Sequence, residues 1–203
     1  MQGGAAQSPV LLAYSTTDGH TRLICERLQA VLQQQALQAE IMPLAQADAC
    51  DLTQFGTLVL GASIRYGKHQ PAVLRFMQTH LAVLQTRPGV FFSVNAVARK
   101  PEKNTAQTNP YVRKLMAQTP WQPQVVTALA GKIDYPRYGW LDRSIIRFIM
   151  QLTGGPTDVR VSTEFTDWSR VAALGQQIAD LQRAWLQARL ATPATSPSPP
   201  PAR

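Results

Sequence analysis

Short apolar runs alternate along the chain with longer segments in which apolar residues recur every three or four positions. The apolar runs predict buried β-strands at residues 10–14, 39–42, 57–63, 89–94 and 125–130. The periodic segments predict helices that start near residues 22 and 71 and that cover residues 110–118 and 167–189. Pro71 suits a first helical turn, where its missing N–H would have no intrahelical partner.

This alternation is typical of an α/β protein with a parallel, doubly wound sheet. Five strands with a polar loop after the first fit the flavodoxin-like strand order 2-1-3-4-5. In that order the ligand site lies at the carboxyl ends of the strands. We therefore expect the chemistry to lie in the loops that follow the strands.

We predict a single domain that contains one insertion and is flanked by two disordered segments. We expect a disordered leader at 1–9, the domain at 10–190, and a disordered tail, rich in Pro, Ser and Ala, at 191–203. An insertion at about 131–161 precedes the last helix, and ordered connections of this length are usually functional. Residues 141–152 within it are amphipathic, which fits either a membrane surface or packing against the domain.

Composition indicates a globular protein and restricts its setting. The 203 residues are 45% hydrophobic, enough for a sizeable core in one domain. No run approaches the roughly 18 continuous apolar residues of a membrane-spanning helix, and the first residues lack a secretory pattern. Cys25 and Cys50 have no metal-binding or redox spacing, so we expect a reducing cytoplasm.

The positive charge is concentrated in one stretch. The chain carries a net charge of +8, and residues 99–147 contain nine cations against three anions, a net +6. Such a field attracts nucleic acid, anionic lipid or an acidic small molecule. For any single residue here, a solvated basic face is the simpler interpretation.

A polar turn follows the first predicted strand. Its hydroxyls and free backbone N–H groups suit a phosphate at the start of a helix. The turn lacks the lysine of a Walker loop and the three glycines of a dinucleotide site, so FMN fits better than ATP or NAD. An ordinary capped helix start is the alternative. The candidate cofactor residues here are Ser15, Thr16, Thr17, Asp18, Gly19, His20 and Thr21.

The loops after the third and fourth strands could surround a flavin ring. Tyr66 would stack on the ring and Gly67 would allow close backbone approach, unless Tyr66 packs on its own loop. Residues 93–98 offer small groups and backbone amides but no aromatic side chain. One face of the ring would then be open to a substrate or covered by the insertion.

Basic residues are interleaved with aromatic ones at residues 98–103 and 135–140. This combination suits a flat anionic aromatic ligand, and it also suits single-stranded nucleic acid. We expect no nucleic-acid partner, because no helix-turn-helix, zinc or ribonucleoprotein signature is present. The three histidines have no metal-ligand spacing and no hydrolase constellation stands out. We therefore expect no metal, identify no catalytic residue, and expect a cofactor to supply the chemistry.

Four motifs carry a resemblance to one enzyme family. They read Ser-Thr-Thr-Asp-Gly-His-Thr at 15–21, Gly-Ala-Ser-Ile-Arg-Tyr-Gly at 61–67, Ser-Val-Asn-Ala-Val-Ala-Arg-Lys-Pro-Glu-Lys at 93–103 and Tyr-Pro-Arg-Tyr-Gly-Trp at 135–140. Together they resemble the quinone-dependent protoporphyrinogen IX dehydrogenases, the oxygen-independent, flavodoxin-like protoporphyrinogen oxidases of proteobacteria. The resemblance spans residues 10–182, and the last three motifs are specific to this family among flavodoxin-like proteins.

The resemblance implies FMN-dependent oxidation of protoporphyrinogen IX to protoporphyrin IX in haem biosynthesis, with menaquinone or ubiquinone as electron acceptor. It also implies peripheral attachment to the anionic, cytoplasmic side of a bacterial inner membrane. A flavodoxin-type electron carrier is the alternative, although such carriers are usually acidic and lack a basic insertion. The oligomeric state stays open.

The same resemblance suggests roles for residues beyond the turn. The ring would be bordered by Ser63, Ile64, Tyr66, Gly67, Ser93, Val94 and Asn95. The substrate propionates would meet Arg99, Lys100, Lys103 and Arg137. Asp18 stands where ordinary flavodoxins have a hydroxyl residue, although an acidic residue is usual in the dehydrogenase family. Because a carboxylate repels a phosphate, we expect Asp18 to point away and to accept backbone N–H bonds.

Overall fold

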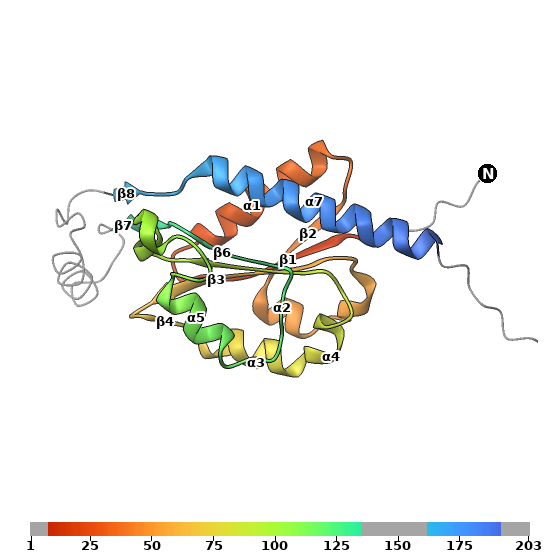
Figure 1. Cartoon of the computed structure of the whole chain (residues 1–203), viewed down its shortest axis with the longest axis horizontal. Coiled ribbons are helices and arrows are strands. Elements are labelled where there is room, and N and C mark those ends of the chain that lie inside the picture. Colours follow the sequence, from red (N-terminus) through yellow and green to blue (C-terminus); the bar gives the residue numbers. More distant parts are fainter. Residues whose placement is uncertain (1–7, 135–161, 192–203) are drawn as a thin grey trace, which may run out of the picture.

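A central parallel sheet lies between two layers of helices in the computed structural model, which describes residues 8–134 and 162–191 (Figure 1). The parallel strands are β1 (Val10–Ser15), β2 (Ala39–Pro43), β3 (Leu58–Arg65), β5 (Gly89–Val94) and β6 (Val125–Leu129). They run in the order β2-β1-β3-β5-β6, which confirms the doubly wound flavodoxin-like prediction.

The helices divide between the two faces of the sheet. One face is covered by α1 (His20–Gln34) and α7 (Trp168–Ala191) (Figure 1). The other face is covered by α2 (Leu44–Asp48), α3 (Pro71–Thr79), α4 (Leu81–Leu84) and α5 (Pro110–Met116) (Figure 1). Each layer has its own apolar core, because parallel strands buried on both faces send alternate side chains into both layers.

The strand register brings the polar residues that follow the strands to one edge. Ser15 pairs with Ala62 of β3, and Ala62 pairs in turn with Ser93 of β5. Parallel strands all end at the same edge, so the loops after β1, β3 and β5 meet there. The fold thus gathers the predicted site residues of these loops at one end of the molecule.

Three short strands lie where the sequence predicts loops. β4 (Lys68–His69) turns back on β3 and pairs with it antiparallel, with Ile64 opposite His69. β7 (Lys132–Asp134) and β8 (Ser162–Glu164) form a separate antiparallel pair at the two borders of the predicted insertion. Residues 135–161, including the amphipathic stretch 141–152, lie outside the described residues, as do 1–7 and 192–203.

Three 3₁₀ turns complete the described elements. They are η1 (Leu52–Gln54), η2 (Ala96–Arg99) and η3 (Pro101–Lys103).

Ser8 and Pro9, which the sequence places in the leader, already hydrogen-bond to the domain: Gly56 donates to the Pro9 carbonyl and Gln182 to that of Ser8.

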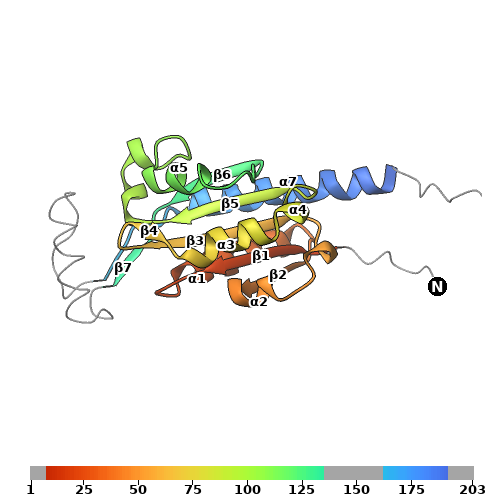
Figure 2. The same ribbon diagram turned by 90° about the horizontal axis from the view of Figure 1, so that it is seen from below.

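The molecule has two distinct ends. β7 and β8 lie at the end where the parallel strands finish, whereas α7 runs past the sheet at the opposite end (Figures 1 and 2).

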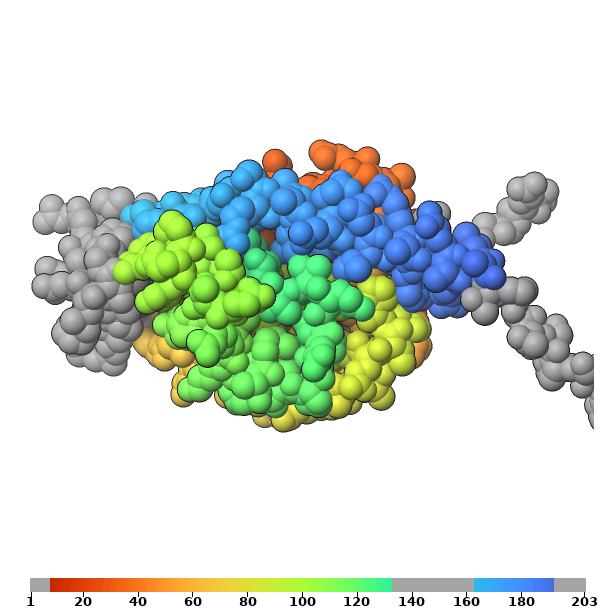
Figure 3. All heavy atoms as spheres, viewed as in Figure 1, coloured from red at the N-terminus to blue at the C-terminus, as the bar shows by residue number. Residues whose placement is uncertain are grey.

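The segment that contains η2 and η3 lies against the start of α7 (Figure 3). There the Arg170 guanidinium donates to the Asn104 carbonyl at 2.8 Å. The basic segment after β5 is thus fixed to the helix layer.

Candidate active site at the strand ends

The polar turn after β1 presents hydroxyls and backbone amides at the amino end of α1. Gly19 is the N-cap residue, in the left-handed region at φ +84°, a conformation that glycine adopts readily. Its N–H donates to Thr16 Oγ1 at 3.0 Å. Glycine supplies no side-chain cap and the first turn of α1 contains no acidic residue, so the positive end of the helix dipole suits an anion.

Thr21 and Ser63 fit a bound polar ligand. Thr21 is fully buried in the first turn of α1, yet its Oγ1 has no hydrogen-bond partner among the described residues. Ser63 Oγ, near the end of β3, is also buried without a partner in this part of the chain. Such a buried group costs about 1–3 kcal/mol unless a ligand or water supplies its bond. Both residues belong to the set that the sequence predicts to hold a cofactor.

Asp18 of the polar turn pairs with an arginine at the end of β3. Asp18 Oδ1 accepts from Arg65 Nη1 at 2.8 Å, so a guanidinium meets its charge, and the backbone N–H bonds expected from the sequence stay a prediction. The reason is topological, because β1 and β3 are neighbours and the side chain of Arg65 reaches across from the end of β3. This ion pair joins the polar turn to the β3–β4 hairpin and offsets the repulsion between Asp18 and a nearby anion.

Tyr66 and Gly67 form the tip of the β3–β4 hairpin. Both have positive φ, +50° and +75°, as two-residue hairpin turns often require. Positive φ is uncommon for tyrosine, so the hairpin holds Tyr66 in a strained conformation of the kind found at functional sites. The residue is 47% exposed, and its ring centroid lies 5.4 Å from the Arg65 guanidinium. Stacking of Tyr66 on a flavin stays a prediction.

Gln70 is a site residue that sequence reasoning missed. It precedes α3, and its Oε1 accepts from Ser15 Oγ at 3.0 Å while its amide nitrogen lies 3.5 Å from Thr17 Oγ1. Gln70 therefore ties the hairpin to the polar turn. The only available signal was its place at the end of the loop after the third strand.

A buried chain of side-chain hydrogen bonds links the loop after β3 to the loop after β5. His69 Nε2 lies 2.9 Å from Ser93 Oγ, which also accepts from Asn95 Nδ2 at 3.1 Å. Asn95 Oδ1 accepts from the Asn109 amide and from the Ala98 backbone N–H. The side chains of Ser93 and Asn95 thus bond inward, so a cofactor would meet this loop through other atoms.

Asn109 extends this network to the basic segment. Its amide donates to the Lys103 carbonyl at 2.9 Å, while its Oδ1 accepts from backbone N–H groups in the first turn of α5. Asn109 is fully buried, so each lost bond would leave an unpaired polar group inside the protein. The network therefore holds η2 and η3, with their cations, against the candidate site.

Both histidines near the site are shifted toward the neutral form. Burial lowers the pKa of His69 to about 4, so the ring is uncharged at neutral pH. Burial also lowers the pKa of His20, partly opposed by Glu164. The His20 Nε2–H donates to Thr166 Oγ1 at 2.6 Å, because that hydroxyl itself donates to the Ala130 carbonyl. The imidazole of His20 is thus bonded to the segment before α7.

The cations predicted for substrate follow β5. Arg99 donates to the Ala96 carbonyl at 2.8 Å and lies 5.8 Å from the Phe165 ring. Lys100 is half-buried and Lys103 is exposed. Arg137 lies outside the described residues. The structure therefore brings three of these four cations to the site end, and their contact with a substrate stays a prediction.

Residues 8–134 and 162–191 contain no group of three or more His, Cys, Asp or Glu side chains that could hold a metal ion. No helix in these ranges has both the length and the apolar character needed to cross a bilayer.

Comparison with known proteins gives two kinds of similarity. Residues 11–160 match a family model described as a flavodoxin domain. The protoporphyrinogen IX dehydrogenase (quinone) of Escherichia coli (strain K12) is 41% identical over 171 residues, which is 84% of this chain and 94% of that protein. The protein of the same name from Leishmania major is 41% identical over 179 residues, 87% of this chain and 78% of that one.

Solved structures agree on the fold alone. A flavodoxin from the domain Archaea superposes with a TM-score of 0.51 at 14% sequence identity. The match covers 86% of this chain and 99% of the archaeal one. The flavodoxin-like architecture is therefore shared with proteins whose sequences have diverged widely.

Proposed function

The chain belongs to the quinone-dependent protoporphyrinogen IX dehydrogenase family of flavodoxin-domain oxidoreductases, and we propose that it oxidises protoporphyrinogen IX to protoporphyrin IX with a quinone as electron acceptor. The observation that carries the proposal is the 41% identity over 84% of the chain to a relative of that name. Menaquinone or ubiquinone is the proposed acceptor, and haem biosynthesis is the proposed pathway.

FMN is the proposed cofactor, and the polar turn fits its phosphate. A phosphate would meet the amino end of α1 and the hydroxyls of Thr16, Thr17 and Thr21, the last of which has no partner among the described residues. Ser63, Ile64, Tyr66 and Gly67 would border the ring on the β3 side, with Val94 on the β5 side. When bound, flavin supplies the two-electron redox chemistry that amino-acid side chains lack.

The described side chains would bind and orient the substrate. Arg99, Lys100 and Lys103 would attract the two propionates, since charge-assisted hydrogen bonds to carboxylates are strong. The buried amides of Asn95 and Asn109 fix this segment in place. Arg137, outside the described residues, is proposed for the same role. No side chain is proposed as an essential acid or base.

An anionic membrane surface is the proposed site of peripheral attachment, on the cytoplasmic side of the bacterial inner membrane. The net charge of +8 supports it, because basic proteins are attracted to anionic lipid. Quinones reside in the bilayer, so attachment would bring the acceptor within reach.

An anaerobic assay tests the activity. FMN-loaded protein is mixed with protoporphyrinogen IX and a short-chain quinone, and porphyrin fluorescence and quinone reduction are followed together. We expect porphyrin to form with three quinones reduced per porphyrin, because the conversion removes six electrons and six protons. The FMN-free protein serves as control and should show only the uncatalysed rate.

The alternative function gives a different result in the same assay. A flavodoxin-type electron carrier would not oxidise protoporphyrinogen, and its flavin would be reduced only by a protein partner. Failure of the FMN-loaded protein to exceed the control would therefore reject the enzymatic proposal in favour of the carrier.

A further inference from the structure

A groove lies between the β3–β4 hairpin and α5, with a cavity volume of about 280 Å³. Its lining includes the apolar side chains of Pro71, Leu74 and Leu115. Pockets for small ligands run from about 300 to 1,000 Å³, so this groove would hold one part of a larger molecule.

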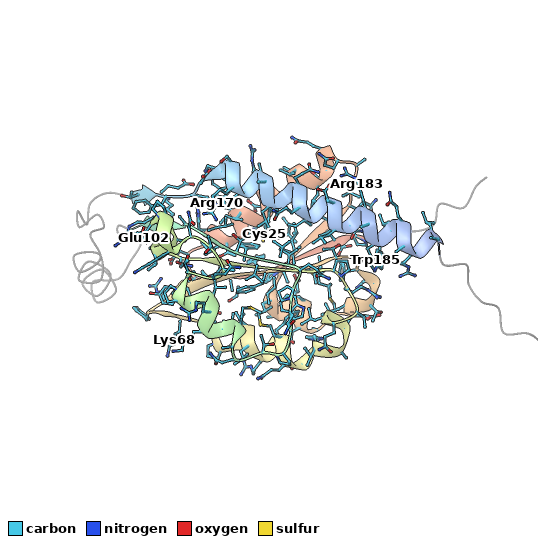
Figure 4. The ribbon with its side chains drawn as sticks, viewed as in Figure 1. Cys25, Lys68, Glu102, Arg170, Arg183 and Trp185 are labelled. Atoms are coloured by element: carbon cyan, nitrogen blue, oxygen red, sulfur yellow. The ribbon has the colours of Figure 1, made fainter. Side chains whose placement is uncertain are left out.

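The polar lining of the groove favours an anion. Lys68 comes from the hairpin and Lys114 from α5, and Tyr111 comes from the first turn of α5. Neither lysine forms an ion pair with any residue in the described ranges, and no acidic residue of these ranges lines the groove. Lys68 projects at the end of the molecule where the parallel strands finish (Figure 4). Two ammonium groups on opposite walls can each meet a carboxylate.

The groove shares three of its residues with the candidate flavin site, and one of them is Gly67 at the tip of the hairpin. Gln70 lines the groove and accepts from Ser15 Oγ of the polar turn. His69 lines it too, and its Nε2 is bonded to Ser93 Oγ at the end of β5. A molecule bound in the groove would therefore lie next to residues of the candidate site.

We propose that this groove is a carboxylate subsite for the tetrapyrrole, in which Lys68 and Lys114 bind a propionate-bearing edge against the apolar lining. The proposal rests on the proposed function, since that function supplies the dicarboxylate tetrapyrrole. It adds two cations, on the hairpin and on α5, to those already predicted in the segment after β5. The sequence motifs alone did not link Lys68 and Lys114 to a binding site.

Binding of the oxidised product and its ester tests the subsite. Protoporphyrin IX and its dimethyl ester are titrated, in the same detergent, against the FMN-loaded full chain. The double variant Lys68→Met/Lys114→Met keeps the apolar stems and removes both charges. We expect it to bind the diacid about tenfold more weakly or worse, and the diester as well as the unchanged protein does. Higher salt should reduce the wild-type preference for the diacid.

A matched control separates the groove from the general field of the protein. Arg27→Met/Arg75→Met removes the same two charges from exposed positions outside the groove and should leave both affinities unchanged. An equal loss in this control, or full diacid affinity in the lysine variant, would overturn the subsite. FMN binding and thermal unfolding confirm that each variant is folded.

The outcomes also distinguish this proposal from the function on which it rests. If the wild type oxidises protoporphyrinogen while the lysine variant binds porphyrin normally, the subsite is wrong and the function stands. If the wild type neither binds porphyrin nor oxidises protoporphyrinogen, the function fails and the subsite falls with it.

Discussion

The buried hydroxyl of Thr21 has no hydrogen-bond partner among the described residues of the free protein. Replacing Thr21 by Val keeps the side-chain shape and removes this unbonded group. The free energy of unfolding of the FMN-free protein should therefore rise by about 1 kcal/mol. FMN affinity should fall by about tenfold, because a hydrogen bond to the phosphate is lost. Urea unfolding and flavin titration measure the two opposite effects.

Thr57 offers the control for that experiment. Its buried hydroxyl donates to Gln182 Oε1 at 2.8 Å, next to the amino end of β3 and away from the site. Thr57→Val should reduce stability by about 1–2 kcal/mol, since it leaves the amide oxygen without its donor, and FMN affinity should not change. Destabilisation by the Thr21 substitution would show that its hydroxyl is satisfied in the free protein.

His69 predicts a pH dependence of stability with a definite sign. Its pKa is about 4 in the folded protein against about 6.5 in the unfolded chain, so the unfolded state binds the proton more readily between these values. Stability from this group is complete above pH 6.5 and is lost as the pH falls toward 4, by about 3 kcal/mol in all.

The variant His69→Gln isolates this contribution. Glutamine can still reach Ser93 Oγ but does not titrate, so its urea-unfolding free energy should decline less between pH 6.5 and 4 than that of the unchanged protein. Parallel declines in the two proteins would mean that His69 is readily protonated in the folded state.

Between elements, α1 and α7 have the most extensive contact of any helix pair among the described residues. A Cβ added to Gly175 of α7 would lie 2.8 Å from Val31 Cγ1 of α1, closer than real contacts allow. Gly175→Ala should therefore lower the free energy of unfolding by about 1–2 kcal/mol, although alanine is the better helix former. Thermal or urea unfolding measures this loss.

The partner of that contact supplies the check. Val31→Ala opens space beside Gly175, so adding it to Gly175→Ala should cost less than the sum of the two single changes. Strict additivity of the two substitutions would show that the helices separate freely and that the close approach is unimportant.

Elements with long buried patterns were predictable, and short ones were not. The apolar runs of β1, β3 and β5 give continuous signals because both faces of these strands are covered. β4 has two residues and α4 has four, too few for any period to show. β4 also depends on positive φ at Tyr66, a non-glycine residue that sequence reasoning would not place there.

Across the whole molecule, the sequence predicted that the loops of the candidate site meet at one edge of the sheet, but not the hydrogen bonds between them. The motifs after β1, β3 and β5 were predictable because a parallel sheet brings such loops to one edge. Asp18 and Arg65 are 47 positions apart, Gln70 is 55 positions from Ser15, and Asn109 is 14 positions from Asn95. No local pattern in the sequence reveals these contacts. They depend on strand order and side-chain reach, which only the folded structure supplies.

β7 and β8 have an implication for how this domain tolerates change. Asp134 sits opposite Ser162, so the chain leaves the domain and returns to it at one antiparallel strand pair. Doubling the length of a flexible loop closed in this way costs only about 0.6 kcal/mol of free energy, through the entropy of loop closure. Changes in the length of the connection between Asp134 and Ser162 should therefore cost the fold little stability, whatever they do to activity.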